Sequence, residues 1–334
     1  MTLTVGVIGT GRIGADHVRR LASQVSGSQV SAVFDVDTVR AAGIAGDVGA
    51  IAHGSWADLV NAPEVDAVVI ASPGRLHAEQ VLACIDAGKP VFCEKPLAPT
   101  GGDCLAVIEA ELAVGRRLVQ VGFMRRYDPA YRVVKGAMDD GSIGEPLLAH
   151  MVHRNATSTA GFTSQMAMTD SVIHEIDTTR WLFGQEVVAA TVVATRRSPL
   201  AAAGLLDPQL VLFELAGGGV VEVEVFVSCQ YGYDVRCEVV GSLGTVSMDN
   251  PGTTSLRRNG QRAEPVPPDW QVRFDTAYRD ELQEWVDSLA AGVVGGPSAW
   301  DGYAAAVVAN CAVRALADGV RTEVTMVDRP GLYA

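Results

Sequence analysis

The residues best suited to acid–base chemistry lie in the segment 168–184, which reads MTDSVIHEIDTTRWLFG. Its apolar spacing predicts one helix that ends at Gly184. Asp170 and His174 are four residues apart and Asp177 follows three residues later, so their side chains are expected on one face of that helix. An aspartate one turn before a histidine orients the imidazole and supports its charged form, which is the arrangement of a general base with its carboxylate partner.

Two other interpretations of this segment stay open. The same three side chains carry nitrogen and oxygen donors of the kind that bind metal ions, although no fourth ligand has a suitable spacing. An amphipathic helix with a solvated polar face would show the same pattern. The six cysteines form no C-x-x-C pair and have no zinc-ligand spacing with histidine, so we expect reduced thiols and no metal.

A second residue suited to chemistry is Lys95, in the sequence Glu94-Lys95-Pro96. It follows the apolar run 89–94, a predicted strand, and ligands of open α/β sheets bind beyond the carboxyl ends of the strands. Only three of the 26 basic residues are lysines, so a lysine here is unusual for this chain. Its compact ammonium can hydrogen-bond a substrate hydroxyl and stabilise a developing alkoxide. The alternative is a surface lysine paired with Glu94.

The sequence Gly9-Thr10-Gly11-Arg12-Ile13-Gly14 follows the first predicted strand and opens a helix. In such a turn the first glycine allows a tight bend, the second lets the backbone approach a pyrophosphate, and the third permits close helix–strand packing. Asp35, followed by Val36, ends the second predicted strand, where a carboxylate hydrogen-bonds the ribose 2′-hydroxyl and disfavours a 2′-phosphate. The pattern predicts an NAD site, and Arg12 leaves NADP open as a poorer cofactor. An ordinary tight turn that binds nothing is the alternative.

These residues need a scaffold, and the first third of the chain has the pattern of one. Short apolar runs alternate with amphipathic segments such as 75–88, which ends in a glycine. Because apolar strands separated by helices pack as a parallel sheet covered on both faces, residues 1–123 are predicted to form an NAD-binding Rossmann domain with a doubly wound parallel sheet. The predicted strands are 3–9, 29–36, 50–53, 66–72, 89–94 and 117–123.

After residue 123 the chain has longer stretches rich in β-branched residues. Several alternate apolar and polar residues, as in VVEVEVFVS at 220–228, and glycine-rich turns separate them. Alternation predicts a sheet with one face less buried, and such turns fit antiparallel hairpins. Residues 124–334 are therefore predicted to form an α+β domain for substrate binding and oligomerisation, with a large open, mostly antiparallel sheet. Its predicted helices lie near 128–139, 170–184, 274–291 and 300–318.

Composition limits the classes of function. The 334 residues, 48% hydrophobic and 19% charged, are enough for two globular domains. A net charge of −13 and a pI of about 4.9 disfavour nucleic acid and anionic membranes as partners, because both bind basic surfaces. No apolar run approaches the roughly 18–20 residues of a membrane span, and the N-terminal residues lack the pattern of a signal peptide. We therefore expect a cytoplasmic protein.

Four motifs together resemble those of the Gfo/Idh/MocA family of NAD(P)-dependent oxidoreductases, essentially from end to end. They are GTGRIG at 9–14, ASPGRLH at 71–77, CEKPLA at 93–98 and D-x-x-x-H at 170–174. Within that family, further motifs of the second half are most similar to those of members that oxidise inositol. These motifs are VGFMRRYDPAY at 121–131, HMVHRNA at 150–156, MAMTDSVIHEIDTTRWL at 166–182 and YGYDVRCEVVG at 231–241.

The resemblance implies roles for individual residues. The lysine of E-K-P and the aspartate and histidine of D-x-x-x-H form the family's catalytic group, which maps here to Lys95, Asp170 and His174. The same three are implied to contact the substrate. The other residues implied to line a polyol pocket are Met124, Arg125, His153, Asp177 and Tyr233, with Trp270 and Tyr278 as weaker candidates.

The resemblance also places residues beside the cofactor. Ser72, Pro73 and His77 would border the nicotinamide, and Glu94 and Lys95 would lie on the same side. Many members have asparagine after that proline, whereas this chain has glycine, which leaves the contact to backbone groups. The peptide between lysine and proline is often cis in such proteins.

The implied reaction is reversible oxidation of one ring hydroxyl of a cyclic polyol, most closely myo-inositol to its 2-keto form. His174 would take the hydroxyl proton with Asp170 orienting it, Lys95 would hydrogen-bond the same oxygen, and hydride would pass to nicotinamide C4. The alternatives are a sister dehydrogenase acting on scyllo-inositol, an aminocyclitol precursor or an aldose sugar, a non-catalytic NAD-binding regulator, and an NAD-dependent glycosidase. A homotetramer is also implied, and no metal is required.

Overall fold

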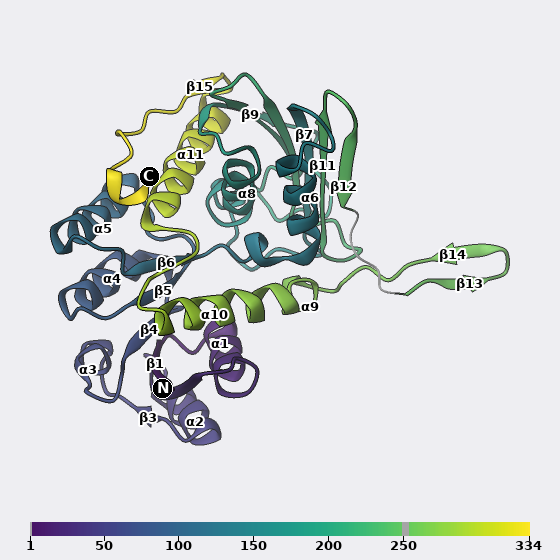
Figure 1. Cartoon of the computed structure of the whole chain (residues 1–334). Coiled ribbons are helices and arrows are strands. Elements are labelled where there is room, and N and C mark those ends of the chain that lie inside the picture. The colour runs from purple at the N-terminus through teal and green to yellow at the C-terminus, as the bar shows by residue number, and fades with distance from the viewer. Residues whose placement is uncertain (1, 249–253) are drawn as a thin grey trace. The chain divides into compact units, whose positions relative to one another are not determined.

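The computed structural model describes residues 2–248 and 254–334 (Figure 1). Contacts within the chain define two compact units. The first unit comprises Met1–Phe123, Tyr278–Ala306 and Val327–Ala334, and the second comprises Met124–Ala277 and Val307–Met326.

The first unit contains a six-stranded parallel sheet in the order β3-β2-β1-β4-β5-β6. This is the doubly wound order, with a switch point between β1 and β4 where the strand order reverses. The six predicted strands and the parallel sheet are confirmed. The strands are β1 (Leu3–Ile8), β2 (Ser28–Phe34), β3 (Ile51–Ala52), β4 (Ala67–Ile70), β5 (Val91–Glu94) and β6 (Val119–Gly122).

Helices cover both faces of this sheet. Val5 and Val7 of β1 face α1, α2 and α10, and together with them form one buried cluster. Gly6 between them faces the other way, where a Cβ atom would lie 2.6 Å from the Leu59 side chain of α3. The helices and short 3₁₀ turns of this unit are α1 (Arg12–Ser23), α2 (Thr38–Val48), α3 (Trp56–Asn61), η1 (Gly74–Leu76), α4 (His77–Asp86), α5 (Gly101–Val114), most of α10 (Asp275–Ala290) and η4 (Gly331–Tyr333).

Two late segments of the chain pack into the first unit. Trp285 of α10 is fully buried, and its ring stands edge-on to Phe92 of β5 with centroids 5.8 Å apart. The Tyr333 hydroxyl donates a hydrogen bond of 2.6 Å to the buried Glu111 carboxylate. The division into domains 1–123 and 124–334 stays a prediction, but the contacts assign 278–306 and 327–334 differently. Amphipathic spacing shows that a helix has an apolar face, not which sheet covers that face.

The second unit contains a seven-stranded sheet in the order β12-β11-β7-β10-β9-β8-β15. Its neighbouring strands are antiparallel except for β7 and β10, so the predicted open, mostly antiparallel sheet is confirmed. The strands are β7 (Pro146–Arg154), β8 (Val187–Ala194), β9 (Gln209–Leu215), β10 (Val220–Phe226), β11 (Asp234–Gly241), β12 (Thr245–Met248) and β15 (Thr322–Glu323); a separate hairpin pairs β13 (Leu256–Arg258) with β14 (Gln261–Ala263).

The predicted single helix over 168–184 has a different form in the structure. It begins with a short α-helical turn, continues as a π-helix and becomes α-helical only at Ile173. It ends as predicted, with Gly184 in the left-handed conformation at φ 62°. A π-segment widens one turn and is often found at functional sites. The helices of this unit are η2 (Met124–Tyr127), α6 (Pro129–Asp139), α7 (Ser164–Met166), η3 (Ala167–Val172), α8 (Ile173–Phe183), α9 (Trp270–Arg273) and the later part of α11 (Ala299–Asp318).

Helix ends follow local sequence signals. Asp128 precedes Pro129 and its carboxylate accepts hydrogen bonds from the N–H groups of Ala130 and Tyr131, which starts α6. Thr100 caps α5 in the same way, and Gly115 ends that helix with a positive φ of 74°. Among the described residues, no helix is both long and apolar enough to cross a membrane.

Trp285 offers a test of how the first unit is stabilised. Replacing a buried tryptophan by alanine removes its apolar contacts and leaves a cavity, which typically costs about 3–5 kcal/mol. We therefore expect Trp285→Ala to lower the midpoint of thermal unfolding strongly. Val133→Ala, at a position 69% exposed on α6, serves as the control and should leave the midpoint nearly unchanged. Equal midpoints for the two variants would contradict the packing of α10 against this sheet.

Candidate active site

The glycine-rich turn after β1 has the geometry of a phosphate-binding turn. Gly9 has a φ of +88°, and a Cβ atom there would lie 2.7 Å from backbone atoms of Ala71 and Ser72, which follow β4. A Cβ atom on Gly14 would overlap the carbonyl oxygen of Gly9. At Gly11, by contrast, a Cβ atom would meet nothing within 4 Å. Gly9 and Gly14 therefore allow the turn to pack closely, whereas Gly11 leaves open space beside the start of α1.

This open space fits the pyrophosphate of a dinucleotide. Gly11 is the N-cap of α1, and because glycine has no side chain, no side-chain hydrogen bond caps the helix. The first N–H groups of α1, beginning at Arg12 and Ile13, are thus directed to the turn, where the helix dipole also favours an anion. These residues therefore fit the NAD predicted from the sequence.

Asp35 lies just beyond the end of β2 and is held by four hydrogen bonds. Its Oδ2 accepts from the N–H of Thr10 at 2.6 Å and from the Thr10 hydroxyl at 3.0 Å. Its Oδ1 accepts from the N–H of Asp37 at 2.9 Å and from Nη2 of Arg40 at 2.8 Å. Burial alone would raise the pKa of Asp35, but these donors outweigh it and hold the pKa at about 2. The carboxylate is therefore ionised and fixed beside the glycine-rich turn.

Arg40 is a residue that sequence reasoning missed. It lies on α2, its side chain is 44% exposed, and its guanidinium partly neutralises the carboxylate expected to select NAD. The signal in the sequence is weak, because an arginine five residues after the aspartate is equally consistent with a solvated helix face. Val36, also predicted beside the cofactor, is 85% exposed at the same end of the sheet.

The E-K-P turn continues directly from β5. Glu94 is buried, and its Oε1 lies 2.7 Å from Nε2 of His17 on α1. Its Oε2 accepts a hydrogen bond of 3.2 Å from the N–H of Lys95. The peptide between Lys95 and Pro96 is cis, as the family resemblance implied. Glu94 is thus part of the framework of the turn, and sequence reasoning missed its partner His17.

The turn after β4 is tied to the E-K-P turn through His77. The Nδ1 atom of this histidine lies 2.7 Å from the carbonyl oxygen of Pro96, and its Nε2 atom lies 2.8 Å from that of Ser72. The Ser72 hydroxyl donates to the side-chain oxygen of Gln80 at 2.7 Å. Pro73 follows as the N-cap of η1. The predicted nicotinamide-side residues therefore lie on two neighbouring turns of one sheet edge.

In the second unit, Arg125 and Glu175 form a buried ion pair. Nη1 of Arg125 donates to Oε1 of Glu175, and both side chains are almost completely inaccessible. Nδ1 of His153 lies 3.1 Å from both Glu175 oxygens and 3.2 Å from Nη2 of Arg125. Burial alone would raise the pKa of Glu175, but the charge of Arg125 and the contact with His153 hold it at about 2.

Three of the predicted pocket residues lie close together around this pair. The ring of His153 stands edge-on to Tyr233 with centroids 5.8 Å apart, and its centroid lies 6.5 Å from that of His174. His174 is 7% exposed and Tyr233 is 5% exposed. Burial raises the pKa of the Tyr233 hydroxyl. Sequence reasoning missed Glu175, because a charged residue does not stand out in a segment that also contains His174, Asp177 and Arg180.

The remaining predicted residues of this unit are in different environments. Asp170 lies in the π-helical segment and is exposed, whereas Asp177 is buried. The Asp177 carboxylate accepts hydrogen bonds from Nε of Arg126 at 2.9 Å and from its Nη2 atom. Met124 is buried at the start of η2, and Trp270 is half-buried at the start of α9. Arg126 is therefore a partner of the candidate site that the sequence motifs did not single out.

Tyr278, the other weaker candidate, belongs to the first unit. Its ring is 6.0 Å from that of His17, and the guanidinium carbon of Arg20 lies 5.7 Å from its centroid. Among residues 2–248 and 254–334, no group of three or more His, Cys, Asp or Glu side chains is arranged to hold a metal ion.

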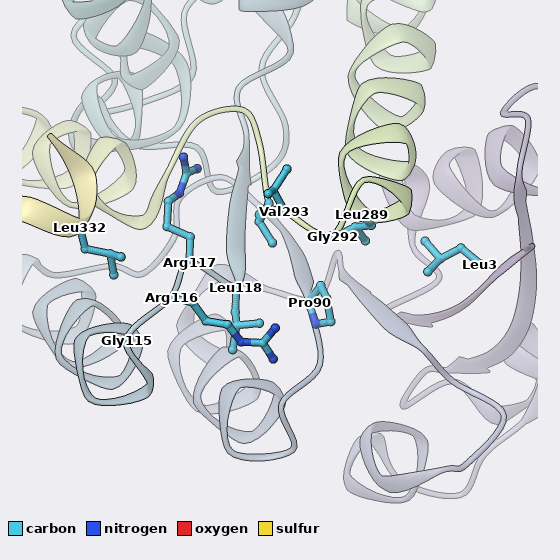
Figure 2. A pocket seen from close by; sticks show the side chains of 11 residues that line it. Leu3, Pro90, Gly115, Arg116, Arg117, Leu118, Leu289, Gly292, Val293 and Leu332 are labelled. Atoms are coloured by element: carbon cyan, nitrogen blue, oxygen red, sulfur yellow. The ribbon is translucent and has the colours of Figure 1, made fainter.

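The first unit also has a cavity of about 530 Å³, shown in Figure 2. Its lining includes Leu3, Pro90 and Leu118, which precede or begin β1, β5 and β6. These are the amino ends of the strands, whereas the glycine-rich and E-K-P turns follow their carboxyl ends. Because parallel strands place these ends at opposite edges of the sheet, this cavity is separate from the candidate active site.

Comparison with known proteins identifies the class to which this fold and these turns belong. Residues 3–123 match the family described as an oxidoreductase family with an NAD-binding Rossmann fold. Residues 131–247 match the GFO/IDH/MocA C-terminal domain. The chain is an NAD-binding oxidoreductase of two-part architecture, as its residues predicted.

Similar proteins match over the whole chain. Inositol 2-dehydrogenase 3 of Saccharopolyspora erythraea is 54% identical over 333 residues, which cover 100% of this chain and 98% of that protein. Inositol 2-dehydrogenase of Pseudomonas fluorescens is 48% identical, with 100% of both chains covered. The crystal structure of myo-inositol dehydrogenase from Lactobacillus casei, in complex with NAD(H) and myo-inositol, superimposes with a TM-score of 0.97 at 37% identity and covers 100% of both chains. The chain belongs to the GFO/IDH/MocA family of oxidoreductases.

The contacts of Asp35 make a prediction about cofactor choice. Asp35→Ser removes the negative charge and releases the Arg40 guanidinium, which can then pair with a 2′-phosphate. We expect the ratio of the Kd for NADP to the Kd for NAD to fall by about tenfold or more, a change of roughly 1.4 kcal/mol. Titration of each cofactor by isothermal calorimetry measures this ratio.

The double variant Asp35→Ser/Arg40→Ala is the matched control. It lacks both charges, so the part of the gain in NADP binding that comes from Arg40 should disappear. An unaltered cofactor ratio in Asp35→Ser would count against a ribose-side role for this carboxylate. A gain of the same size in the double variant would count against Arg40 as its source.

Proposed function

We propose that this enzyme oxidises one ring hydroxyl of a cyclic polyol with NAD, and that its substrate is myo-inositol, which becomes the 2-keto compound. The observation that carries the proposal is the full-length similarity to proteins named inositol 2-dehydrogenase and to a myo-inositol dehydrogenase solved with NAD(H) and myo-inositol. The buried polar groups of the second unit support it, because a polyol presents many hydroxyls and needs many hydrogen-bond partners.

In the proposed reaction, His174 accepts the proton of the reacting hydroxyl as general base. Asp170 balances the charge that develops on the imidazole. The ammonium of Lys95 hydrogen-bonds the same oxygen and stabilises its developing negative charge. When bound, NAD supplies the hydride acceptor at C4 of its nicotinamide. The electrons of the breaking C–H bond leave with the hydride, and the carbonyl forms as the hydroxyl proton passes to the base.

The other residues proposed for substrate binding orient the ring. His153 and Tyr233 present polar atoms on buried rings, and Arg125 with Glu175 fixes the position of His153. Asp177 is proposed as a hydroxyl acceptor that Arg126 holds in place. Met124 would supply the apolar contact to the carbon face of the ring. An inositol has both polar edges and apolar faces, so this mixture suits it.

The catalytic assignment is tested by His174→Ala and Lys95→Ala. Removing a general base typically costs about 10²–10⁴ in rate, and we expect kcat for myo-inositol to fall by such a factor in His174→Ala. Removing one donor to a developing oxyanion typically costs about 10²–10³, and we expect that loss in Lys95→Ala. The Kd for NAD should change little, because the glycine-rich turn and Asp35 are intact. Formation of NADH at 340 nm and calorimetric titration of NAD supply the two readouts.

Two control variants at partly exposed positions match these changes in residue type. His53→Ala removes a histidine paired with Glu64, and Lys135→Ala removes a lysine paired with Asp139. Both should retain the kcat of the unmodified enzyme. Unchanged turnover in His174→Ala would remove this residue as the base, and unchanged turnover in Lys95→Ala would remove the proposed alkoxide contact.

The choice of substrate is tested with a panel of myo-inositol, scyllo-inositol, chiro-inositol, glucose, galactose and a glycoside, each with NAD and with NADP. The highest kcat/KM is expected for myo-inositol with NAD. Activity confined to another polyol or sugar would overturn the substrate and keep the reaction. Absence of activity on the whole panel, with NAD still bound, would favour the non-catalytic NAD-binding protein.

We also propose a homotetramer that uses the outer face of the second unit's sheet. On this face, Leu148, Leu210 and Leu212 are half-buried on neighbouring or nearby strands and alternate with inward-facing residues. The same face carries an ion pair between Arg154 and Glu224 and a contact of 2.6 Å between Nδ1 of His150 and Oε2 of Glu222. Apolar residues surrounded by charged pairs are typical of a surface that binds a second copy.

Light scattering coupled to size exclusion tests the assembly. The unmodified protein should have the mass of four chains, and Leu212→Asp should lower that mass by placing a charge in the interface. Leu243→Asp, at a position 80% exposed in the turn before β12, is the control and should leave the mass unchanged. A monomer in the unmodified protein would overturn the proposal. That the enzyme acts in the cytoplasm is a further proposal, which its six free cysteines support.

A further inference from the structure

Two buried histidines of the first unit contact the E-K-P turn. His17 lies on α1, immediately after the glycine-rich turn, and His77 begins α4. Their exposed fractions are 0% and 1%, so neither ring is available to solvent. A buried imidazole carries polar atoms that are costly to desolvate unless they are hydrogen-bonded. The partners of these two rings therefore indicate what they stabilise.

The partners of His77 are two backbone carbonyl groups on different turns. Nδ1 lies 2.7 Å from the oxygen of Pro96 and Nε2 lies 2.8 Å from the oxygen of Ser72. A carbonyl oxygen only accepts hydrogen bonds, and a neutral imidazole has only one N–H group. Both contacts are therefore hydrogen bonds only when the ring is protonated. The neutral ring can donate a hydrogen bond to only one of the two carbonyl groups, so its hydrogen bond to the other turn is lost.

The charged groups that face His77 act in opposite directions. Glu94 at the end of β5 favours the protonated ring, and Lys95 disfavours it. Burial is the largest effect and lowers the pKa of His77, while the two carbonyl groups raise it. The double hydrogen bond is consequently present at low pH and is lost as the pH rises through a value below the ordinary 6.5 of histidine.

His17 contacts the same turn through Glu94, which precedes Lys95, whereas His77 contacts Pro96, which follows it. Its Nε2 lies 2.7 Å from Oε1 of Glu94, whose Oε2 accepts the N–H of Lys95. The ring of His17 is edge-on to Phe92 at 5.5 Å and to Tyr278 at 6.0 Å, so aromatic packing fixes its orientation. The backbone on both sides of Lys95 is thus attached to a buried imidazole.

We infer that His17 and His77 are positioning residues for Lys95, which fix the E-K-P turn from its two sides and attach it to the turn after β4. The inference rests on the proposed role of Lys95 in the reaction. Neither histidine is assigned a contact with the reacting atoms. Their effect is to reduce the number of positions that the ammonium group can occupy, which matters because small displacements in an active site reduce rates strongly.

His77→Leu and His77→Gln test the inference as a pair. Leucine fills similar space without hydrogen bonds, whereas the glutamine amide has two N–H donors on one nitrogen, which do not titrate. We expect kcat for myo-inositol to fall by about tenfold or more in His77→Leu, as for other positioning contacts, and to recover substantially in His77→Gln. The Kd for ADP-ribose should be unchanged in both, since that fragment needs the glycine-rich turn and Asp35. A kcat for His77→Leu within about twofold of the unmodified enzyme would overturn the inference.

The pH dependence supplies a readout that a purely structural role would not change. The ratio of kcat for the unmodified enzyme to kcat for His77→Gln should fall as the pH rises through a value below 6.5, because only the imidazole loses a hydrogen bond there. A ratio that is constant with pH would contradict a titrating contact at His77. If His77→Leu does not fold, His17→Phe replaces it, since phenylalanine retains the aromatic packing and removes only the bond to Glu94.

A double-mutant cycle separates this inference from the proposed catalytic role. If His77 acts through Lys95, His77→Leu should have little further effect on the residual rate of Lys95→Ala. Full additivity of the two changes would overturn the inference and leave the role of Lys95 intact. Unchanged kcat in Lys95→Ala alone would instead overturn the proposed role of Lys95, whatever His77→Leu does.

Discussion

The close approach of two turns at the switch point of the parallel sheet is the constraint on which the first unit depends. The turn after β1 touches the turn after β4 so closely that any side chain at Gly9 would collide with backbone atoms of Ala71 and Ser72. The carboxyl ends of β1 and β4 are neighbours only because the strand order reverses there. The E-K-P turn follows β5, the next strand, and His77 contacts both this turn and the same turn after β4.

Much of this fold was predictable because its signals are local. Apolar strands, glycine helix ends and the glycine-rich turn each depend on a few consecutive residues, and the observed strands of the first sheet lie within or close to the predicted runs. The alternation in 220–228 likewise predicted one half-exposed face of the second sheet. The assignment of α10 was not predictable in this way, because the Trp285 ring packs against Phe92 from a strand almost two hundred residues earlier.

The candidate site shows the same limit at the level of side chains. Sequence motifs selected Asp177 and Asp35, but not their partners Arg126 and Arg40. They likewise selected His153 but not Glu175, which it contacts. A motif identifies residue types at fixed spacing, whereas an ion pair depends on two elements meeting in space. The π-helical turn around Asp170 was missed for a related reason, since hydrogen-bond spacing in a helix is set by packing as well as by composition.

Two buried carboxylates titrate far from neutrality. Asp35 and Glu175 both have pKa values held at about 2 by their donors. The stability that each contributes is present above the ordinary carboxyl pKa and is lost only as the pH falls toward 2. Histidine is the side chain whose charge ordinarily changes between pH 5 and pH 8. Two histidines lie on the framework of the E-K-P turn and two lie in the aromatic group of the second unit. The hydrogen bonds of His77 are therefore expected to change at a pH below 6.5, whereas Asp35 and Glu175 keep their charge until the pH falls toward 2.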